Sequence, residues 1–194
     1  MDVRVLRGAA LDSALEDVAR LRIAVFRSYP YLYDGDLDYE TRYLDAYRGN
    51  DRAILVGAFD GAQLVGASTG TPLEEHADDF AAAFDGRGLE LNQIFYCAES
   101  VLLPEYRGQG IGHAFFDARE NHARALGRCQ SVFCSVMRPD GHSKRPADYI
   151  PLDRFWRKRG YAPLPGAVAQ FRWKDLDQPG ETDHSLQFWI RSLQ

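Results

Sequence analysis

Apolar and polar residues alternate in short blocks over the first 50 positions, and the period changes from block to block. Residues 3–8 (VRVLRG) alternate with a period of two, which predicts a short strand. A helix is predicted next, because apolar residues recur every three or four positions at Leu15, Val18, Leu21 and Val25. Ser13 and Glu16 have the S-x-x-E spacing of a capping box, so we expect this helix to begin near Ser13 and to run to about Phe26.

A loop, a helix and a hairpin are predicted to follow. The stretch 28–40 (SYPYLYDGDLDYE) is rich in tyrosine and in acids and is expected to be a loop, leading into a helix over residues 40–47. The blocks 53–59 (AILVGAF) and 63–69 (QLVGAST) flank Asp60-Gly61. That dipeptide suits a tight turn between two antiparallel strands.

The middle of the chain has the order strand, glycine-rich turn, helix, strand. Residues 93–103 (QIFYCAESVLL) are apolar, aromatic and β-branched enough for a largely buried strand. The segment 104–112 (PEYRGQGIG) follows directly, then a helix over 113–127 and a buried strand over 131–137. This order is typical of a crossover unit with two parallel strands. The remaining predicted elements are helices over 74–84 and 151–161 and strands over 167–173 and 186–191.

Composition and charge narrow the class of protein. The chain has 194 residues, of which 45% are hydrophobic and 26% charged, and no repeat or linker divides it, so we expect a single domain over residues 1–194. The formal net charge of -5 argues against a nucleic-acid partner bound through a global positive field. No signal-peptide core is present, and no apolar run approaches the ~18 residues that span a membrane, so we predict no membrane partner.

Neither the cysteines nor the histidines have the spacing of a metal site. Cys97, Cys129 and Cys134 form an odd set without CxxC spacing, which fits neither a disulfide framework nor a zinc site. We therefore predict no metal, and a reducing cytoplasm is the simplest location. Cysteines in buried strands are usually small core residues, and we interpret Cys97 and Cys134 in that way rather than as nucleophiles.

The glycine-rich segment 104–112 predicts an anion-binding turn. Glycines let the backbone approach a ligand closely, and free N–H groups at a helix start attract negative charge. The spacing excludes a P-loop, which needs GxxxxGK before Ser or Thr. It also disfavours a dinucleotide fingerprint, because His113 stands where GxGxxG requires its last glycine. The spacing that fits is R-x-x-G-x-G, formed by Arg107, Gly110 and Gly112.

This pattern resembles the pyrophosphate loop, Q/R-x-x-G-x-G/A, of the GNAT superfamily of acyl-CoA-dependent N-acyltransferases. The resemblance implies an α/β fold of the mixed α+β type, with a twisted, mostly antiparallel central sheet that contains one splayed parallel strand pair and is flanked by helices. It implies acetyl-CoA as co-substrate. Its pyrophosphate would be held by Arg107, Gly108, Gln109, Gly110, Ile111 and Gly112. The preceding strand would offer its backbone to the pantetheine at Val101, Leu102 and Leu103.

One carboxylate, Glu99, interrupts the otherwise uncharged run 93–103. Burying a carboxylate costs free energy and raises the pKa of a carboxyl group, which suits a base that takes a proton from an ammonium substrate. The resemblance implies the same role, because many family members place an acid in this strand. The alternative is a structural carboxylate paired with an arginine.

The family often places a tyrosine four residues before the final glycine-aromatic pair to protonate the leaving thiolate, but Trp156 stands there in this chain. Tyr149, just before the last helix, is our candidate for the acid, and Tyr96 and His142 are alternatives. For each of the three a structural role stays open.

The resemblance also implies where the acceptor binds. Segment 34–51 carries six acids against two arginines, and the loop that it includes borders the acceptor site in the family, so we expect an acidic mouth that attracts an amine cation. Tyr29, Tyr31 and Tyr33 are expected either to line that pocket or to cover the core.

The predicted function is therefore transfer of an acetyl group from acetyl-CoA to a primary amine of a small-molecule or peptide acceptor, by direct attack. The alternative is a non-catalytic acyl-CoA-binding or sensing module, which Trp156 favours and Glu99 disfavours. The identity of the acceptor and the oligomeric state stay open, a homodimer included.

Overall fold

The hairpin predicted around Asp60-Gly61 forms one half of the central sheet. β2 (Ile54–Asp60) and β3 (Gln63–Pro72) pair antiparallel, and Gly61 in the turn has φ +59°, a value that favours glycine. β1 (Asp2–Leu6) pairs with the outer edge of β2. The computed structural model describes all residues from Met1 to Gln194.

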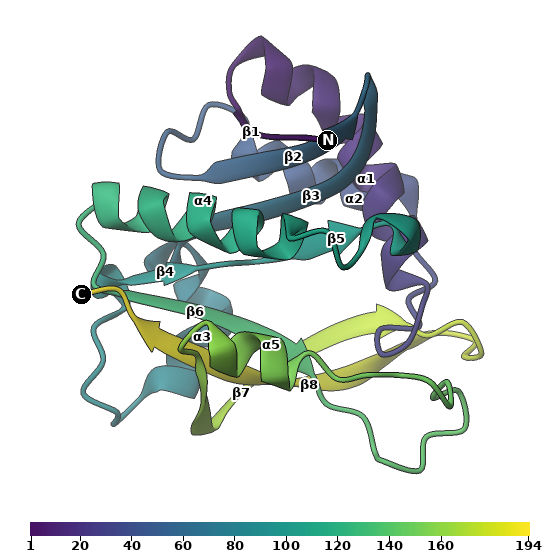
Figure 1. Cartoon of the computed structure of the whole chain (residues 1–194). Helices are drawn as coiled ribbons and strands as arrows, with labels where there is room; N and C mark the ends of the chain where they lie inside the picture. The colour runs from purple at the N-terminus through teal and green to yellow at the C-terminus, as the bar shows by residue number, and fades with distance from the viewer.

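The complete sheet has eight strands in the order β1-β2-β3-β4-β6-β8-β7, with β5 paired to β3 (Figure 1). All neighbours are antiparallel except β4 and β6, which pair in parallel. This confirms the predicted mostly antiparallel sheet with one parallel pair. The remaining strands are β4 (Ile94–Tyr96), β5 (Ser100–Leu102), β6 (Gln130–Val136), β7 (Ala162–Lys174) and β8 (Glu181–Ser192).

The prediction of one continuous strand over 93–103 is wrong. β3 pairs with β5 at Ser68↔Ser100 and with β4 at Thr71↔Tyr96, so residues 69–70 of β3 lie opposite residues 97–99. The extra residue is a bulge, which bends the strand and ends its ladder with β6. Beyond Tyr96 the last bond to β6 is Cys97 N–H to the Val132 carbonyl, 2.8 Å. β5 and β6 then run apart (Figure 1).

Two helices differ in their starts from the sequence prediction. α1 (Ala9–Phe26) begins four residues before Ser13, and the predicted capping box is absent because the Ser13 hydroxyl instead donates to the Ala9 carbonyl, 2.7 Å. α2 (Leu37–Leu44) begins three residues before the predicted position, because Asp36 caps it by accepting from the Tyr39 N–H at 2.8 Å.

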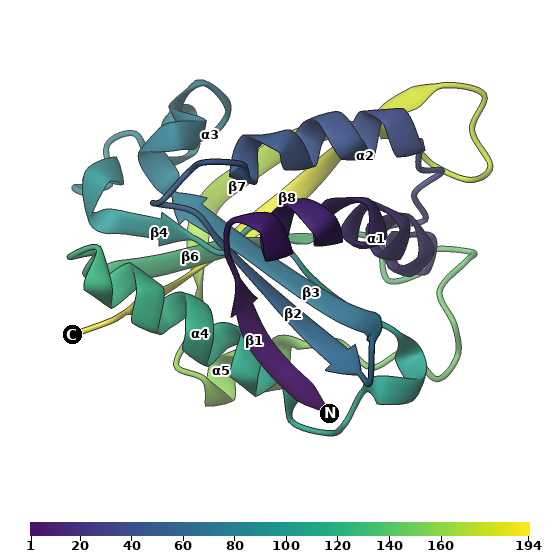
Figure 2. The ribbon, with the colours of Figure 1, turned by 90° about the horizontal axis from the view of Figure 1, so that it is seen from above.

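The helices cover both faces of the sheet (Figure 2). α1 and α2 lie on one face, where Leu55 and Val101 join their core cluster, and α4 lies on the other, where Val56 packs. A third cluster joins α3 to β7 and β8. The other helices are α3 (Ala77–Phe84), α4 (Ile111–Ala125) and α5 (Asp153–Lys158), with 3-10 turns at Asp45–Tyr47, Leu73–His76, Leu91–Gln93 and Pro104–Tyr106. No helix is long and apolar enough to cross a membrane.

A strap formed by residues 32–34 joins the loop after α1 to the end of β7. The Asp34 N–H donates to the Lys174 carbonyl and the Leu176 N–H donates to the Leu32 carbonyl, each at 2.8 Å. Arg138, which follows β6, fastens the same place: it donates to the Pro30 and Tyr31 carbonyls and pairs with the buried Asp175 at 2.9 Å. The strap thus brings together three segments that are distant in the sequence, namely 30–34, Arg138 and 174–176.

Candidate active site

The glycine loop between β5 and α4 offers a row of unpaired backbone donors. Gly108 and Gly110 have φ of +76° and +82°, and a Cβ added to either would meet nothing within 4 Å. The N–H groups from Gly108 to Gly112 form no backbone hydrogen bond. They stand at the start of the 15-residue helix α4, whose dipole favours negative charge there. The loop can therefore bind an anion such as a pyrophosphate.

The other residues of the predicted loop support its shape. The Arg107 guanidinium donates to the Leu102 carbonyl from Nε and from Nη2, each at 3.3 Å, so its side chain braces the loop against β5. The Gln109 amide donates to the Glu105 carbonyl at 3.4 Å. At Gly112 a Cβ would lie 3.4 Å from the Phe155 ring, so glycine permits the close approach of α5.

The register of β5 decides which of its backbone groups are free. The Leu103 N–H donates to the Val65 carbonyl, and the Glu99 carbonyl accepts from the Thr69 N–H. Antiparallel pairs alternate between bonded and non-bonded, so Val101 is also bonded to β3, whereas the backbone groups of Ser100 and Leu102 face the side that β6 has left. Of the three residues predicted to meet the pantetheine, Leu102 alone turns its backbone N–H to that side.

A cavity of about 220 Å³ lies between the diverging strands, and we call it the β5–β6 cavity. Its walls come from the strand break and β6, from α4, from α5 and the loop before it, and from the end of α1 and the loop after it. Tyr149 and Trp156 belong to this lining. Trp156 packs against Phe133 and Trp189, with ring centroids 4.9 and 5.1 Å away, so it is a wall residue with no acidic proton to give.

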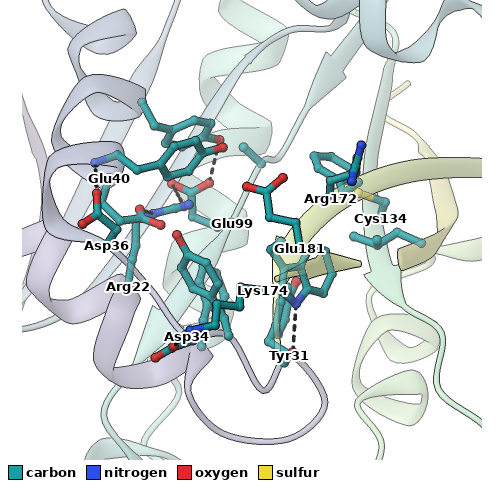
Figure 3. A pocket seen from close by; sticks show the side chains of 18 of the residues that line it. Arg22, Tyr31, Asp34, Asp36, Glu40, Glu99, Cys134, Arg172, Lys174 and Glu181 are labelled. Atoms are coloured by element: carbon teal, nitrogen blue, oxygen red, sulfur yellow. Dashed lines mark hydrogen bonds and ion pairs between the residues drawn. The ribbon is translucent and has the colours of Figure 1, made fainter. Parts of the chain in front are cut away.

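A larger cavity of about 460 Å³ lies on the α1 side, and we call it the tyrosine cavity (Figure 3). Its walls come from α1, the strap, α2 and the β7–β8 hairpin. Tyr31 and Tyr33 line this cavity, whereas Tyr29 packs edge-on to Tyr149 outside it. Five residues line both cavities: Phe26, Tyr31, Ala98, Glu99 and Cys134. The two cavities therefore meet at the break between β4 and β5.

Glu99 lies at that meeting point and is 8% exposed. Its carboxylate is 2.7 Å from Arg22 Nη1 and accepts from the Tyr43 hydroxyl at 3.3 Å. Arg22, on α1, also pairs with the buried Glu40 of α2. Burial lowers the pKa of the Arg22 guanidinium, but the neighbouring carboxylates outweigh this and raise it well above its ordinary value. Glu99 is thus both paired with an arginine and directed to a cavity.

The three candidate acids have different surroundings. Tyr149 is in the wall of the β5–β6 cavity, and partial burial raises the pKa of its hydroxyl, so it stays protonated and able to donate. Tyr96 is buried, and its hydroxyl lies 3.4 Å from Cys134 Sγ. His142 lies in the loop after β6, where its Nδ1 accepts from the Lys144 N–H. Tyr149 alone of the three lines the β5–β6 cavity.

The cysteines have the properties of core residues. Burial raises the pKa of the Cys97 thiol, and it raises the pKa of the Cys134 thiol to about 12, so both stay protonated near neutral pH. Cys97 Sγ lies 3.4 Å from the Ser131 hydroxyl. No three His, Cys, Asp or Glu side chains gather as a metal site requires.

Two buried arginines, Arg22 and Arg119, are residues that the sequence prediction missed. Arg119 is 1% exposed, forms no ion pair, and donates to the Thr69 and Glu99 carbonyls at 3.2 and 2.9 Å and to the Ser100 hydroxyl at 2.8 Å. It therefore holds the bulge open from α4. The sequence did contain a sign that both arginines are buried. Arg119 stands four residues after the buried Phe115, and Arg22 stands four residues after the buried Val18, so both lie on the apolar faces of their helices.

Comparison with known proteins places this geometry in context. Residues 16–147 match the model of the Acetyltransferase (GNAT) family. The yncA protein of Salmonella typhimurium with its cofactor acetyl-CoA is similar in fold, with 14% identity and a TM-score of 0.61 over 100% of this chain and 94% of that one. An aminoglycoside 6'-N-acetyltransferase complexed with coenzyme A has 16% identity and a TM-score of 0.61, over 100% and 98% of the two chains.

A third similar structure is the ribosomal-protein-alanine N-acetyltransferase from Brucella melitensis, with 13% identity and a TM-score of 0.63 over 99% of each chain. Identities this low establish a shared fold and nothing finer. A search of curated proteins found no match to the sequence.

Proposed function

The chain belongs to the Acetyltransferase (GNAT) family, and from that premise we propose that it transfers the acetyl group of acetyl-CoA to a primary amine. The observation that carries the proposal is the position of Glu99, which lines both the β5–β6 cavity and the tyrosine cavity. A carboxylate at this boundary can take a proton from an amine on one side while the thioester lies on the other.

Backbone groups hold the coenzyme in this proposal. The free N–H groups from Gly108 to Gly112 bind the pyrophosphate, and Arg107 keeps the loop in place. The pantetheine follows the open side of β5, where Ser100 and Leu102 present their backbone groups. The thioester then lies in the β5–β6 cavity, which Ser100 lines, and backbone N–H groups near Leu102 on the open side of β5 polarise its carbonyl oxygen.

The reaction is a direct transfer. Glu99 accepts a proton from the ammonium group, directly or through a water molecule, and the neutral amine attacks the thioester carbonyl carbon. A C–N bond forms and the C–S bond breaks. The departing thiolate takes the Tyr149 hydroxyl proton, and the second proton of the attacking nitrogen returns to the Tyr149 phenolate, so the products are the N-acetyl amide and the CoA thiol. The proton held by Glu99 then passes to solvent. Arg119 keeps the strand break open throughout. Neither cysteine takes part, because both thiols stay protonated.

The second candidate is a non-catalytic acyl-CoA-binding or sensing module of the same fold. Two observations favour it: Trp156 stands at the usual tyrosine position, and Glu99 is neutralised in part by Arg22. The coenzyme site would be unchanged in such a protein.

The acetyltransferase proposal also includes the cytoplasmic location and the small-molecule or peptide acceptor that the sequence predicts.

Two measurements separate the candidates. Isothermal titration with acetyl-CoA reports coenzyme binding, and coupled detection of free thiol reports release of CoA across a panel of primary amines. Sub-millimolar binding with amine-dependent thiol release is expected for the acetyltransferase. Binding without release by any amine identifies the sensing module, and absence of binding removes both.

A further inference from the structure

The tyrosine cavity has an uncompensated negative charge at its base. One cation, Arg22, serves two carboxylates there, Glu40 and Glu99. Glu40 is 1% exposed, and its Oε1 atom accepts no hydrogen bond. Burial raises the pKa of the Tyr33 and Tyr43 hydroxyls, and the charges of Glu40 and Glu99 respectively raise them further, as a negative cavity requires. A buried carboxylate oxygen without a partner indicates a place for a cationic ligand.

The charged groups at the rim do not neutralise the negative charge at the floor of the cavity. Lys174 pairs with Asp34 at 2.8 Å, and Arg172 pairs with Asp183 at 3.4 Å. Asp36 and Glu181 add further negative charge to the lining (Figure 3). The lining has three cationic and five anionic side chains, a formal excess of two negative charges. Each cation of the lining already has an acidic partner.

The walls of the tyrosine cavity, between its floor and its rim, are aromatic. Eight aromatic residues line the cavity, among them Tyr31, Tyr33, Tyr43, Tyr96, Phe171 and Trp173. Two of the polar groups on these rings already form hydrogen bonds within the protein. The Tyr43 hydroxyl donates to Glu99, and Trp173 Nε1 donates to the Tyr31 carbonyl at 3.1 Å. Aromatic faces bury apolar surface and attract cations, but they give little to a second charged group on the ligand.

The strap limits access for an extended peptide. Residues 32–34 and 174–176 already hydrogen bond with each other, so neither backbone offers a free edge beside the cavity. A peptide acceptor usually gains affinity from such an edge. The volume of about 460 Å³ is within the range of small-molecule pockets, roughly 300–1,000 Å³.

We propose that the acceptor is a small primary amine with one positive charge, an aromatic body and no carboxylate, bound in the tyrosine cavity with its ammonium toward Glu40 and Glu99. The ammonium supplies the positive charge that Arg22 alone does not provide. The acetyl transfer rests on the proposed function, whereas the binding of such an amine stands on the cavity itself.

Four amines of different charge and shape test the proposal against the wild-type protein. 2-Phenylethylamine has the predicted features, L-phenylalanine adds a carboxylate, n-propylamine lacks the ring, and spermidine adds further charges. Binding is measured by isothermal titration in the presence of CoA, and turnover by release of thiol from acetyl-CoA. We expect 2-phenylethylamine to bind at least about tenfold more tightly than each of the other three. Its kcat/KM should exceed theirs by a similar factor.

Variants test the assigned residues. Glu40→Gln removes the charge of a carboxylate that shares Arg22 with Glu99. It should weaken 2-phenylethylamine binding about tenfold without changing acetyl-CoA affinity, because Glu40 does not line the β5–β6 cavity. Phe171→Ala, at a partly exposed wall position, keeps the test valid if the Glu40 variant does not fold, and should weaken the same amine several-fold. Glu16→Gln, an exposed carboxylate of α1, is the matched control.

The outcomes for the two proposals are distinguishable. Tighter binding of 2-phenylethylamine without any thiol release supports the acceptor class and overturns the catalytic proposal. Turnover that prefers L-phenylalanine or spermidine overturns the acceptor class and leaves the transferase intact. Equal affinity for all four amines, or an unchanged affinity in both variants, also overturns the acceptor class.

Discussion

The two cavities that meet at Glu99 are built in different ways. The β5–β6 cavity and the glycine loop beside it use backbone groups, and their key parts follow one another in the chain from the bulge at residues 97–99 to Gly112. The tyrosine cavity uses side chains, which come from α1, the strap, α2 and the β7–β8 hairpin. Backbone groups recognise what every acyl-CoA shares, whereas dispersed side chains can be changed singly. The difference explains how one fold can keep its coenzyme and vary its acceptor.

The largest expected effect comes from Glu99→Gln, which keeps the shape of the side chain where the cavities meet. Loss of the base should lower kcat by about 10²-fold or more, because general base catalysis typically contributes 10²–10⁴. Acetyl-CoA affinity should be unchanged in isothermal titration. The defect should also shrink with weakly basic amines, which are already deprotonated and need no base. Equal turnover by the variant and by wild type would remove Glu99 from the mechanism.

The second effect is on stability and concerns the strap beside the tyrosine cavity. Arg138→Met leaves Asp175 buried without its cation and releases the Pro30 and Tyr31 carbonyls. Breaking a buried pair in this way should lower the free energy of unfolding by about 3 kcal/mol, measured in urea. The KM for the amine should rise, because the strap loosens, while acetyl-CoA affinity stays the same.

Arg48→Met is the matched control for that prediction. Arg48 pairs with Asp12 and Asp45, but all three side chains are about half exposed, so its loss should change stability by less than about 1 kcal/mol. A similar loss for Arg48→Met and Arg138→Met would contradict the assignment of a fastening role to Arg138.

The same contrast explains what the sequence could predict. The hairpin, the parallel strand pair and the glycine loop depend on local signals, namely alternation, Asp60-Gly61 and R-x-x-G-x-G, and each is present in the structure. The family match supports the resemblance that the loop carries. Glu99 is the one charged residue in 93–103, and a single carboxylate does not distinguish a cleft-facing strand residue from a break in the strand. The break has no further local signal. It depends on a side chain from another element, Arg119.

The tyrosine cavity, which is the proposed acceptor site, was predictable only in outline. The acidic segment 34–51 does contribute Asp34, Asp36 and Glu40 to the tyrosine cavity. The partners of these acids, Lys174 and Arg22, stand far from them in sequence, and pairing between distant residues leaves no periodic pattern. The sequence could have indicated that Arg22 and Arg119 are buried, because each stands at helical spacing from apolar residues and so lies on the apolar face of its helix.

The third prediction addresses the coenzyme side. Gly110→Ala places a Cβ at φ +82° in the loop, and it should weaken acetyl-CoA binding about tenfold by straining and obstructing the turn. Gly61→Ala is the matched control, since Gly61 has φ +59° and equally open surroundings in the β2–β3 turn. Both variants should lose similar stability in urea, about 1 kcal/mol. A coenzyme affinity equal to wild type in Gly110→Ala would exclude the loop as the pyrophosphate site.

The smallest expected effect is a pH dependence at the fastening of the strap. His184 is buried, stacks on Trp173 with ring centroids 3.7 Å apart, and lies 3.6 Å from Asp175. Burial lowers the pKa of this imidazole below its ordinary value of 6.5, although Asp175 acts in the opposite direction. A lowered pKa means that the neutral form is favoured on folding. The stability that His184 contributes is therefore complete above about pH 6.5 and is lost as pH falls toward the folded-state value.

Measurements of unfolding in urea at pH 7.5 and pH 5.5 check this sign. Wild type should be less stable at pH 5.5, and His184→Gln should lose less stability between the two values. His76 also has a lowered pKa through burial, so the double variant with His76→Gln should lose less still. Asp175 does not interfere, because Arg138 helps to hold the pKa of its carboxyl below 3.8, outside the window. Amine KM should rise in the same range more than acetyl-CoA KM, because His184 supports the strap and not the glycine loop.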